Sequence, residues 1–494
     1  MHSTNTFLSL QVNFVVCQLF ALLASVWFRL YLHPSKSSSY VRHAVATLLG
    51  FYLALFCFGW YAFHFVLQIN ILFILFCFKL FTFCLLRFCF VIALGYLTMC
   101  QISRVYLFDY GLYSTDFSGP MMIMTQKITS LAFEIHDGMS RKEKHLSPFQ
   151  KSLAVRTMPS LLEYLSYNCN FMGILVGPFY TYKDYIAFIE GRTLHMKCTE
   201  INGEGKGHLE QKEPSPTTTV LFKLLVCGIS LSFHLTITKM LPVEYNIDTT
   251  FMNTAPLISR IIYLYVSLLA ARPKYYFAWT LADAINNAAG FGFNGFNKKG
   301  DARWDLISNL NICNIEFATS FKMFIDNWNI QTALWFKRVC YDRCPYHPTI
   351  ATFILSAMWH GVYPGYYMTF FTGILMTLAA RAIRNNFRFY FLKSPGVKLF
   401  YDIITWCATM IAISYTVAPF VLLSVESSLK FYSSWYYSVH IIAVLVIAVL
   451  PIKPRHKEDE QEYSKQKQIE VENLLVMNHA STMNNNLNQA PREL

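Results

Sequence analysis

Apolar stretches long enough to cross a lipid bilayer recur along most of this sequence. A transmembrane helix needs about 20 consecutive apolar residues, and about nine stretches meet or approach that length. These stretches are 12–32, 44–67, 69–100, 161–179, 220–241, 258–271, 351–380, 403–425 and 436–450. With two further candidates, 120–135 and 275–293, the pattern predicts an all-α polytopic membrane protein with about eleven transmembrane helices.

Charge is scarce and basic. Only 14% of the residues are charged, against about 25% in soluble proteins, which argues against a set of soluble domains. The net charge of +12 could indicate a nucleic-acid partner. In a polytopic protein it more often reflects basic cytoplasmic loops, so we expect no nucleic acid.

The positions of the basic residues predict the orientation. Arg29, Lys36 and Arg42 flank the first connection, and Lys453, Arg455 and Lys457 follow the last apolar stretch. These groups place the first loop and the C-terminus in the cytoplasm and the N-terminus on the other side of the membrane.

Two parts differ in composition. Residues 1–452 carry the apolar stretches and are predicted to form one transmembrane domain. Residues 453–494 are rich in Gln, Asn, Glu and Lys and poor in aromatics, which predicts a disordered cytoplasmic tail. Cys340 and Cys344 lie close together near polar residues but lack partner histidines, so we expect no metal site.

The stretch GFGFNG, residues 290–295, matches the dinucleotide-binding pattern G-x-G-x-x-G. That pattern is informative only between a strand and a helix of a soluble domain. Here it follows a helical polar stretch between apolar runs. We therefore expect the glycines to allow close helix approach or a break that lines a cavity.

Three polar residues interrupt the apolar sequence before this stretch. Asp283, Asn286 and Asn287 are spaced i, i+3, i+4 and so share one face of a helix. In a membrane protein such a face points inward. This face could line a water-filled cavity, or it could form a polar contact between helices. The sequence does not distinguish these two alternatives.

The uncharged stretch FILSAMWHGVYPGYYMTF contains His360, within the longer run 351–380. Burying an ionisable side chain in a membrane is costly, so such a residue is a functional candidate by default. The alternative is a packing residue with its hydrogen bonds satisfied, a role better suited to His64 and His440.

A second polar cluster lies just upstream, in FIDNWNIQTALWFKRVC. It holds Asn327 and Asn329 beside Trp328. If the segment is helical, residues two apart point about 200° away from each other, so only one asparagine can face His360.

Three blocks of this sequence resemble the membrane-bound O-acyltransferases, in the order and separation of their lysophospholipid acyltransferase branch. They are the Trp-Asp pair at Trp304 and Asp305, WNIQTALWFK at 328–337 and WHGVYPGYYMTF at 359–370. The likeness extends over about 11–451. It implies a fold with a buried central chamber in the endoplasmic-reticulum membrane, acting on membrane lipids.

The resemblance implies transfer of a fatty acyl group from acyl-CoA to the free hydroxyl of a lysophospholipid. Acyl-CoA would be a co-substrate, and no cofactor is implied. His360 would be the general base, since an imidazole titrates near neutral pH. Asn329, directly after Trp328, would stabilise the oxyanion or fix the acceptor.

Further residues are candidates for substrate binding. The candidates are Trp304, Asp305, Asp283, Asn286, Asn287, Trp335, Lys337, Arg338 and Arg384. Among them, Lys337, Arg338 and Arg384 are candidates for contact with CoA, because CoA is anionic and its access route should carry cations.

The headgroup and acyl chain stay open. The resemblance suggests lysophosphatidylethanolamine first, then lysophosphatidic acid, lysophosphatidylcholine or lysophosphatidylserine, with a monounsaturated donor such as oleoyl-CoA. One competing class is a lipid transporter or scramblase, in which His360 and Asp283 would serve a polar path. Another is an acyltransferase that acts on a sterol or a protein.

Overall fold

The computed structural model describes residues 2–77, 83–108, 116–202, 214–297, 299–392 and 394–451. Within these ranges the chain is helical, and extended pairing is limited to two isolated bridges, Phe296 to Ala302 and Leu310 to Trp328. The predicted tail 453–494 lies outside the described residues.

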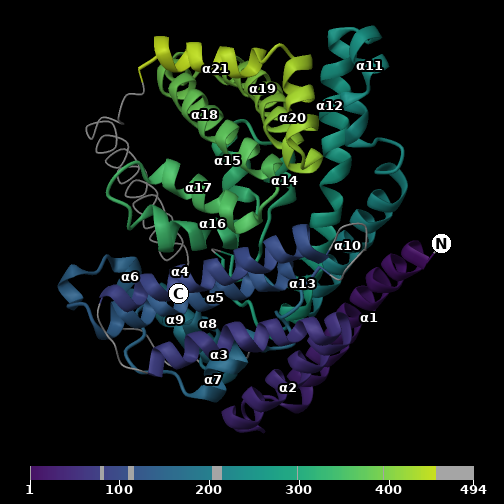
Figure 1. Ribbon diagram of the computed structural model, residues 1–494. Helices are drawn as coiled ribbons and strands as arrows, with labels where there is room; N and C mark the ends of the chain where they lie inside the picture. The colour runs from purple at the N-terminus through teal and green to yellow at the C-terminus, as the bar shows by residue number, and fades with distance from the viewer. Residues whose placement is uncertain are drawn as a thin grey trace, which may run out of the picture.

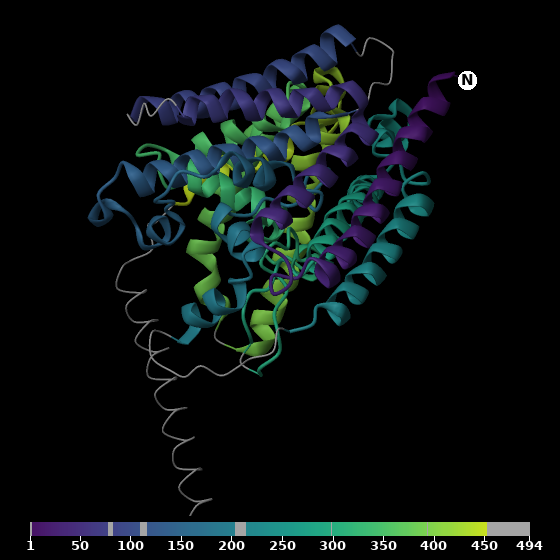
Figure 2. The ribbon, with the colours of Figure 1, turned by 90° about the horizontal axis from the view of Figure 1, so that it is seen from below.

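Five helices from the N-terminal part form one side of the molecule, drawn purple to blue in Figure 1. They are α1 (His2–Tyr31), α2 (Ser39–Phe58), α3 (Phe63–Cys77), α4 (Phe83–Ile102) and α5 (Ser118–Met139). A 3-10 turn, η1 (Gly59–Ala62), links α2 to α3, and a π-helical turn, η2 (Ser103–Phe108), follows α4. Seen from below, the long blue helices lie at one edge of the molecule (Figure 2).

The middle of the chain alternates short and long helices. They are α6 (Pro148–Leu153), α7 (Leu161–Cys169), α8 (Tyr182–Ile189), α9 (Thr193–Asn202), α10 (Thr217–Ile237), α11 (Thr249–Thr254), α12 (Leu257–Ala271) and α13 (Pro273–Ala288). The 3-10 turns here are η3 (Glu143–His145) and η4 (Val243–Ile247). Helix α13 packs against both α1 and α10 and lies between them (Figure 1).

The C-terminal helices fill the green-to-yellow part of Figure 1. They are α14 (Ile312–Glu316), α15 (Phe321–Asn327), α16 (Ile330–Phe336), α17 (Pro348–His360), α18 (Pro364–Phe387), α19 (Pro395–Leu422), α20 (Val425–Ser434) and α21 (Ser438–Val449). A π-helical turn, η5 (Lys337–Tyr341), follows α16, and a 3-10 turn, η6 (Arg388–Phe391), follows α18. Helix α18 packs against α17, α19 and α21 and is the centre of this part.

Six helical segments of the described chain are long and apolar enough to cross a membrane: Val12–Tyr31, Ser39–Ile74, Phe88–Tyr106, Thr217–Ile237, Pro364–Phe391 and Pro395–Leu422. The pair α20 and α21, bent by 73°, would make a seventh if counted as one span. The predicted all-α polytopic membrane class is confirmed. The count of about eleven spans stays a prediction.

The outer face of α10 shows why these helices suit a lipid environment. Leu221, Phe222, Leu225 and Ile229 are each more than 60% exposed and lie on one long helix. An apolar surface of this kind is rare on a protein surrounded by water. Contact with lipid chains removes the unfavourable hydration of these side chains.

Several predicted apolar runs are not single helices, and two of them, 161–179 and 351–380, bear on the site. In 161–179, α7 ends at Cys169 and residues 170–179 form turns and irregular chain. In 351–380, α17 ends at His360 and α18 begins at Pro364. Apolar character predicted these segments as membrane spans. It did not show where glycine and proline interrupt the helices.

Candidate active site

His360 is the last residue of α17, so it lies at a helix break and not in the middle of a helix as the uncharged run predicted. Gly361 follows with φ 137°, a conformation that residues with a Cβ rarely adopt. A Cβ at this position would also lie 3.4 Å from the Tyr366 ring. Pro364 then begins α18 with a ring suited to the first helical turn.

Aromatic rings surround the imidazole of His360. The ring centroids lie 4.7 Å away for Trp359, 5.9 Å for Tyr366, and 5.1 Å for both Phe370 and Phe420. The histidine side chain is partly exposed. In the described part of the chain, neither imidazole nitrogen has a hydrogen-bond partner. Packing therefore orients the ring, and both nitrogens are open to a ligand.

Trp359 ties the end of α17 to two other helices. Its indole Nε1 donates to the carbonyl of Met122 at 3.1 Å. Its own carbonyl, in the last turn of α17, accepts from Gln101 Nε2 at 3.2 Å. Carbonyls at a helix end lack partners within the helix, so Gln101 satisfies one of them directly beside His360.

Asn329 lies between α15 and α16 in the left-handed conformation, with φ 50° and ψ 51°. Asparagine is among the few residues other than glycine that adopt it readily. Its side chain is partly exposed and, within the described ranges, its carboxamide has no hydrogen-bond partner. The amide can therefore bind a ligand.

Backbone hydrogen bonds on both sides hold Asn329 in this conformation. The N–H of Ile330 donates to the carbonyl of Asn309 at 2.8 Å, and the N–H of Asn311 donates to the carbonyl of Asn327 at 3.1 Å. Asn309 Oδ1 also accepts from the N–H of Gln331 at 3.0 Å. The segment after Trp304 thus positions Asn329.

The assumption that Asn327 and Asn329 share a helix is wrong. Asn327 ends α15 and Asn329 precedes α16. The Asn327 carboxamide donates to the carbonyl of Met323 at 2.8 Å and accepts from Asn314 at 3.0 Å. Those bonds are structural, in contrast to the unpartnered amide of Asn329.

One face of α5 contacts both α16 and α17, the helices next to Asn329 and His360. Met122, Gln126 and Thr129 are spaced i, i+4, i+7 and lie on the same side of the helix. Their contacts are Met122 O with Trp359 Nε1 at 3.1 Å, Gln126 Nε2 with Thr332 Oγ1 at 3.0 Å, and Thr129 Oγ1 with Trp335 Nε1 at 3.0 Å. Sequence reasoning missed this role of α5, although the polar run QKITS within an apolar stretch was the available signal.

Ring contacts connect the surroundings of Asn329 and His360. Trp335 of α16 lies 5.9 Å from Trp359, the residue before His360. Tyr275 lies 5.6 Å from Trp328, and Tyr366 lies 5.9 Å from His360. Aromatic rings therefore lie beside both candidate catalytic residues.

The polar face of α13 is largely satisfied by the protein itself. Lys223 Nζ lies 2.6 Å from Asp283 Oδ2 and 2.8 Å from Asn287 Oδ1. Asp283 Oδ2 also accepts from Ser308 at 2.7 Å. Asn286 donates to the Met172 carbonyl at 3.1 Å. These bonds fit a polar contact between helices better than the lining of a wet cavity.

Trp304 and Asp305 belong to the segment that holds Asn329. Trp304 is buried, and its carbonyl accepts from Lys223 at 3.0 Å. Asp305 accepts from Asn294 at 2.8 Å and pairs with Arg303 at 2.7 Å. Both residues therefore stabilise the loop in this structure.

Of the predicted cations, Lys337 and Arg338 lie on η5 and Arg384 lies on α18. Lys337 is exposed and lies 3.4 Å from Asp342, whereas Arg338 is half-buried. The Arg338 guanidinium stacks 5.1 Å from Phe149. Arg384 lies in the last turn of α18 and is partly exposed.

Glu134 was missed by sequence reasoning. It is 5% exposed, and neither carboxylate oxygen has a hydrogen-bond partner in the described chain. With Ser130 and Arg338 it lines a cavity of about 20 Å³. That volume is enough for about one water molecule.

The Lys223–Asp283 pair makes a testable prediction. Lys223→Met leaves a buried carboxylate unpaired, which should destabilise the protein by about 3–5 kcal/mol. The double variant Lys223→Met/Asp283→Asn should recover most of that loss, because no charge is then left unpaired. Thermal unfolding midpoints in one detergent would measure both. Equal midpoints for the single variant and the unaltered protein would contradict the assignment.

Comparisons with known proteins show the family of this chain. Residues 102–422 match the model of the MBOAT, membrane-bound O-acyltransferase family. The chain is 66% identical over 483 residues to "Membrane-bound glycerophospholipid O-acyltransferase 2" of Gallus gallus, covering 97% of this chain and 93% of that protein. Identity to the Homo sapiens protein of the same name is 66% over 484 residues, with the same coverage. Identity to "Membrane-bound glycerophospholipid O-acyltransferase 1" of Mus musculus is 56% over 455 residues, 92% of each chain.

Proposed function

Because this chain belongs to the membrane-bound O-acyltransferase family, we propose that it is a lysophospholipid acyltransferase. It transfers a fatty acyl group from acyl-CoA to the free hydroxyl of a lysophospholipid. The observation that carries the proposal is the similarity over nearly the whole chain to relatives named glycerophospholipid O-acyltransferases. The unpartnered polar groups of His360 and Asn329, each beside aromatic rings, support it.

His360 acts as the general base. The lysophospholipid hydroxyl gives its proton to an imidazole nitrogen as its oxygen attacks the thioester carbon. The open nitrogens of His360 support this role. The tetrahedral intermediate then collapses, the carbon–sulfur bond breaks, and the imidazolium returns the proton to the CoA thiolate.

Asn329 supplies a neutral hydrogen-bond donor. Negative charge develops on the thioester oxygen during attack, and a preorganised donor stabilises it without a change in charge. The clamped backbone on both sides of Asn329 supports such preorganisation. The same amide could instead fix the acceptor hydroxyl, which would also lower the barrier.

The aromatic surroundings of His360 serve a further purpose. Water competes with the lipid hydroxyl for the thioester, and a site lined by rings such as Phe370 and Phe420 admits little of it. We propose that the CoA moiety approaches from the cytoplasmic side, past cations that include Lys337, Arg338 and Arg384.

The preferred acceptor is lysophosphatidylethanolamine, with lysophosphatidic acid, lysophosphatidylcholine and lysophosphatidylserine as further acceptors. The preferred donor carries a monounsaturated chain such as oleoyl.

A transporter or scramblase would need a polar path that includes Asp283. The bonds of Asp283 to Lys223 and Ser308 speak against that path.

The protein resides in the endoplasmic-reticulum membrane, with its N-terminus in the lumen and its C-terminus in the cytoplasm. The basic residues after the last apolar stretch support this orientation.

The general-base assignment predicts that His360→Ala lowers acyl transfer by about 100-fold or more, because the proton acceptor is lost. Turnover of lysophosphatidylethanolamine with oleoyl-CoA by purified protein would measure this. His64→Ala is the matched control, since the His64 imidazole already bonds to the Tyr96 hydroxyl at 2.8 Å. Near-normal turnover in folded His360→Ala protein would refute the mechanism.

Three asparagine variants separate side-chain chemistry from backbone conformation. Asn329→Gly keeps the left-handed backbone and removes the amide, whereas Asn329→Ala also strains the backbone. Both should lower turnover by about 10- to 1,000-fold, the range expected when a positioned donor is lost. Asn327→Ala should keep most turnover at matched protein levels.

Two results would change this assignment. Normal turnover in Asn329→Gly with loss in Asn329→Ala would mean that the backbone conformation, not the amide, is needed. Loss of turnover in Asn327→Ala, with normal turnover in both Asn329 variants, would mean that Asn327 and not Asn329 is the catalytic asparagine.

The orientation predicts the accessibility of a tag placed after Leu494. An antibody should reach the tag when only the plasma membrane is permeabilised. A tag protected until the reticulum membrane is opened would reverse the orientation. It would also move the proposed approach of CoA to the other side.

A further inference from the structure

Beside Trp359, three aromatic rings from two helices lie against the imidazole of His360. Tyr366 and Phe370 belong to α18, whereas Phe420 belongs to α19. The Phe420 ring stands at 89° to the imidazole, and its centroid lies 4.4 Å from that of Tyr366. In the described chain no hydrogen bond orients the imidazole, so its position depends on how α18 packs against α19.

A close backbone contact joins these two helices next to the rings. Helices α18 and α19 pack side by side (Figure 1). The N–H of Gly365, in the first turn of α18, donates to the carbonyl of Leu423, at the end of α19, at 2.8 Å. Gly365 directly precedes Tyr366, and Leu423 lies three residues after Phe420. The contact therefore joins the helix ends that carry the rings.

This contact leaves no room for a side chain at Gly365. A Cβ there would lie 2.2 Å from the carbonyl oxygen of Pro419 and 2.9 Å from the Cα of Leu423. Both are backbone atoms, which cannot rotate away as the end of a flexible side chain can. A methyl group at this position would therefore push α18 and α19 apart, and would move Tyr366 with α18.

Leu423 adopts a strained conformation at the same contact. Its φ is 62° and its ψ is −45°, a combination that residues with a Cβ rarely adopt. The N–H of Ser424 donates to the carbonyl of Leu422 at 2.7 Å, which closes a γ-turn of the strained, positive-φ kind around Leu423. In a continuing helix the Leu423 carbonyl would point along the helix axis. The turn instead directs it to Gly365.

We propose that Gly365 and Leu423 are positioning residues for His360. The turn at Leu423 and the missing side chain of Gly365 set the distance between α18 and α19. That distance sets where Tyr366 and Phe420 hold the imidazole. The inference rests on the proposed acyl transfer, in which a general base must lie within hydrogen-bond reach of the acceptor hydroxyl. Gly365 and Leu423 act only through the rings and do not contact the reacting atoms.

Gly365→Ala should lower kcat by about 10- to 100-fold, because a displacement of about 1 Å at a reacting group has effects of this size. The KM for lysophosphatidylethanolamine should change little, since Gly365 contacts no substrate. Turnover is compared per amount of folded protein after size-exclusion chromatography. A loss of stability alone would lower the yield of folded protein and not its kcat.

Two variants of Leu423 separate its backbone conformation from its side chain. Leu423→Gly keeps the carbonyl and adopts a positive φ readily, so it should keep most of the turnover. Leu423→Val keeps an apolar side chain but resists a positive φ because valine is β-branched, so it should lower kcat as Gly365→Ala does. If the Leu423 side chain mattered instead, Leu423→Gly would be the more damaging change.

A second measurement needs no turnover. The C2–H of an imidazole exchanges slowly with deuterium, and it exchanges faster where the ring is more open to solvent. Mass spectrometry of the full chain in maltoside micelles would give this rate for His360. Gly365→Ala and Leu423→Val should raise the rate severalfold, because the rings around the imidazole pack less tightly. Leu423→Gly should leave it unchanged.

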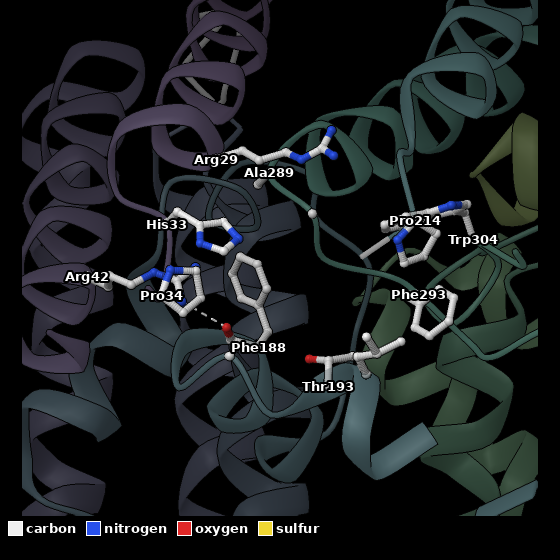
Figure 3. Close-up of a pocket in the computed structure, with 13 residues that line it drawn as sticks. Arg29, His33, Pro34, Arg42, Phe188, Thr193, Pro214, Ala289, Phe293 and Trp304 are labelled. Atoms are coloured by element: carbon white, nitrogen blue, oxygen red, sulfur yellow. Dashed lines mark hydrogen bonds between the residues drawn. The ribbon is translucent and has the colours of Figure 1, made fainter. Parts of the chain in front are cut away.

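Two matched controls place the same defects elsewhere. Gly138→Ala puts a Cβ 2.1 Å from the Val155 carbonyl oxygen, at a site about 24 Å along α5 from the contact with α17 at Met122. Gly290→Ala strains a backbone with φ 90° beside the cavity of about 60 Å³ shown in Figure 3. None of the described residues that line this cavity belongs to α17, α18 or α19. Neither control should change the exchange rate of His360.

Each outcome decides the proposal. It would be overturned by normal kcat or an unchanged His360 exchange rate in Gly365→Ala, by lower kcat in Leu423→Gly than in Leu423→Val, or by equally fast exchange in the controls. If Gly365→Ala does not purify as folded protein, the two Leu423 variants decide. If the unaltered protein transfers no acyl group, the proposed function fails, whereas the exchange rates still decide whether Gly365 and Leu423 position His360.

Discussion

Away from water, every polar group must find its partner within the protein, and that constraint organises this structure. It favours helices, in which each segment satisfies most of its own backbone groups. It also explains the polar side chains inside the molecule. Lys223 bonds to Asp283 and Asn287, and Gln126 bonds to Thr332. These bonds connect helices that apolar packing alone would hold less specifically.

The two candidate catalytic residues are among the exceptions to that constraint, as is Glu134. Within the described residues, the imidazole of His360 and the carboxamide of Asn329 lack partners, while neighbouring residues are bonded. Both side chains are partly exposed, so their free hydrogen-bonding groups can reach a ligand. The bonded Asn327, two residues from Asn329, shows that the local structure can satisfy an asparagine where function does not need it.

Unusual backbone conformations place these two residues. Asn329 is left-handed and Gly361 has a positive φ, so each catalytic candidate lies at a helix break next to a conformation that ordinary residues avoid. Asn309 accepts the hydrogen bonds that hold the first break, and bonds of Trp359 with Gln101 and Met122 hold the second. Helix α5 contacts α16 and α17, the helices beside these two breaks. The helix breaks therefore hold the side chains of Asn329 and His360 in defined positions.

The sequence by itself determined that this is a helical membrane protein, because bilayer-length apolar runs are a one-dimensional property of the chain. It also singled out His360 and Asn329, through their polarity and their motifs. It could not show that 351–380 breaks at Gly361, or that Asn327 and Asn329 lie on separate helices. Tertiary hydrogen bonds from distant residues, such as Asn309 and Gln101, hold those breaks. The contacts of α5 with α16 and α17 and the pairing of Asp283 with Lys223 each join segments far apart in sequence, so only the folded structure decided them.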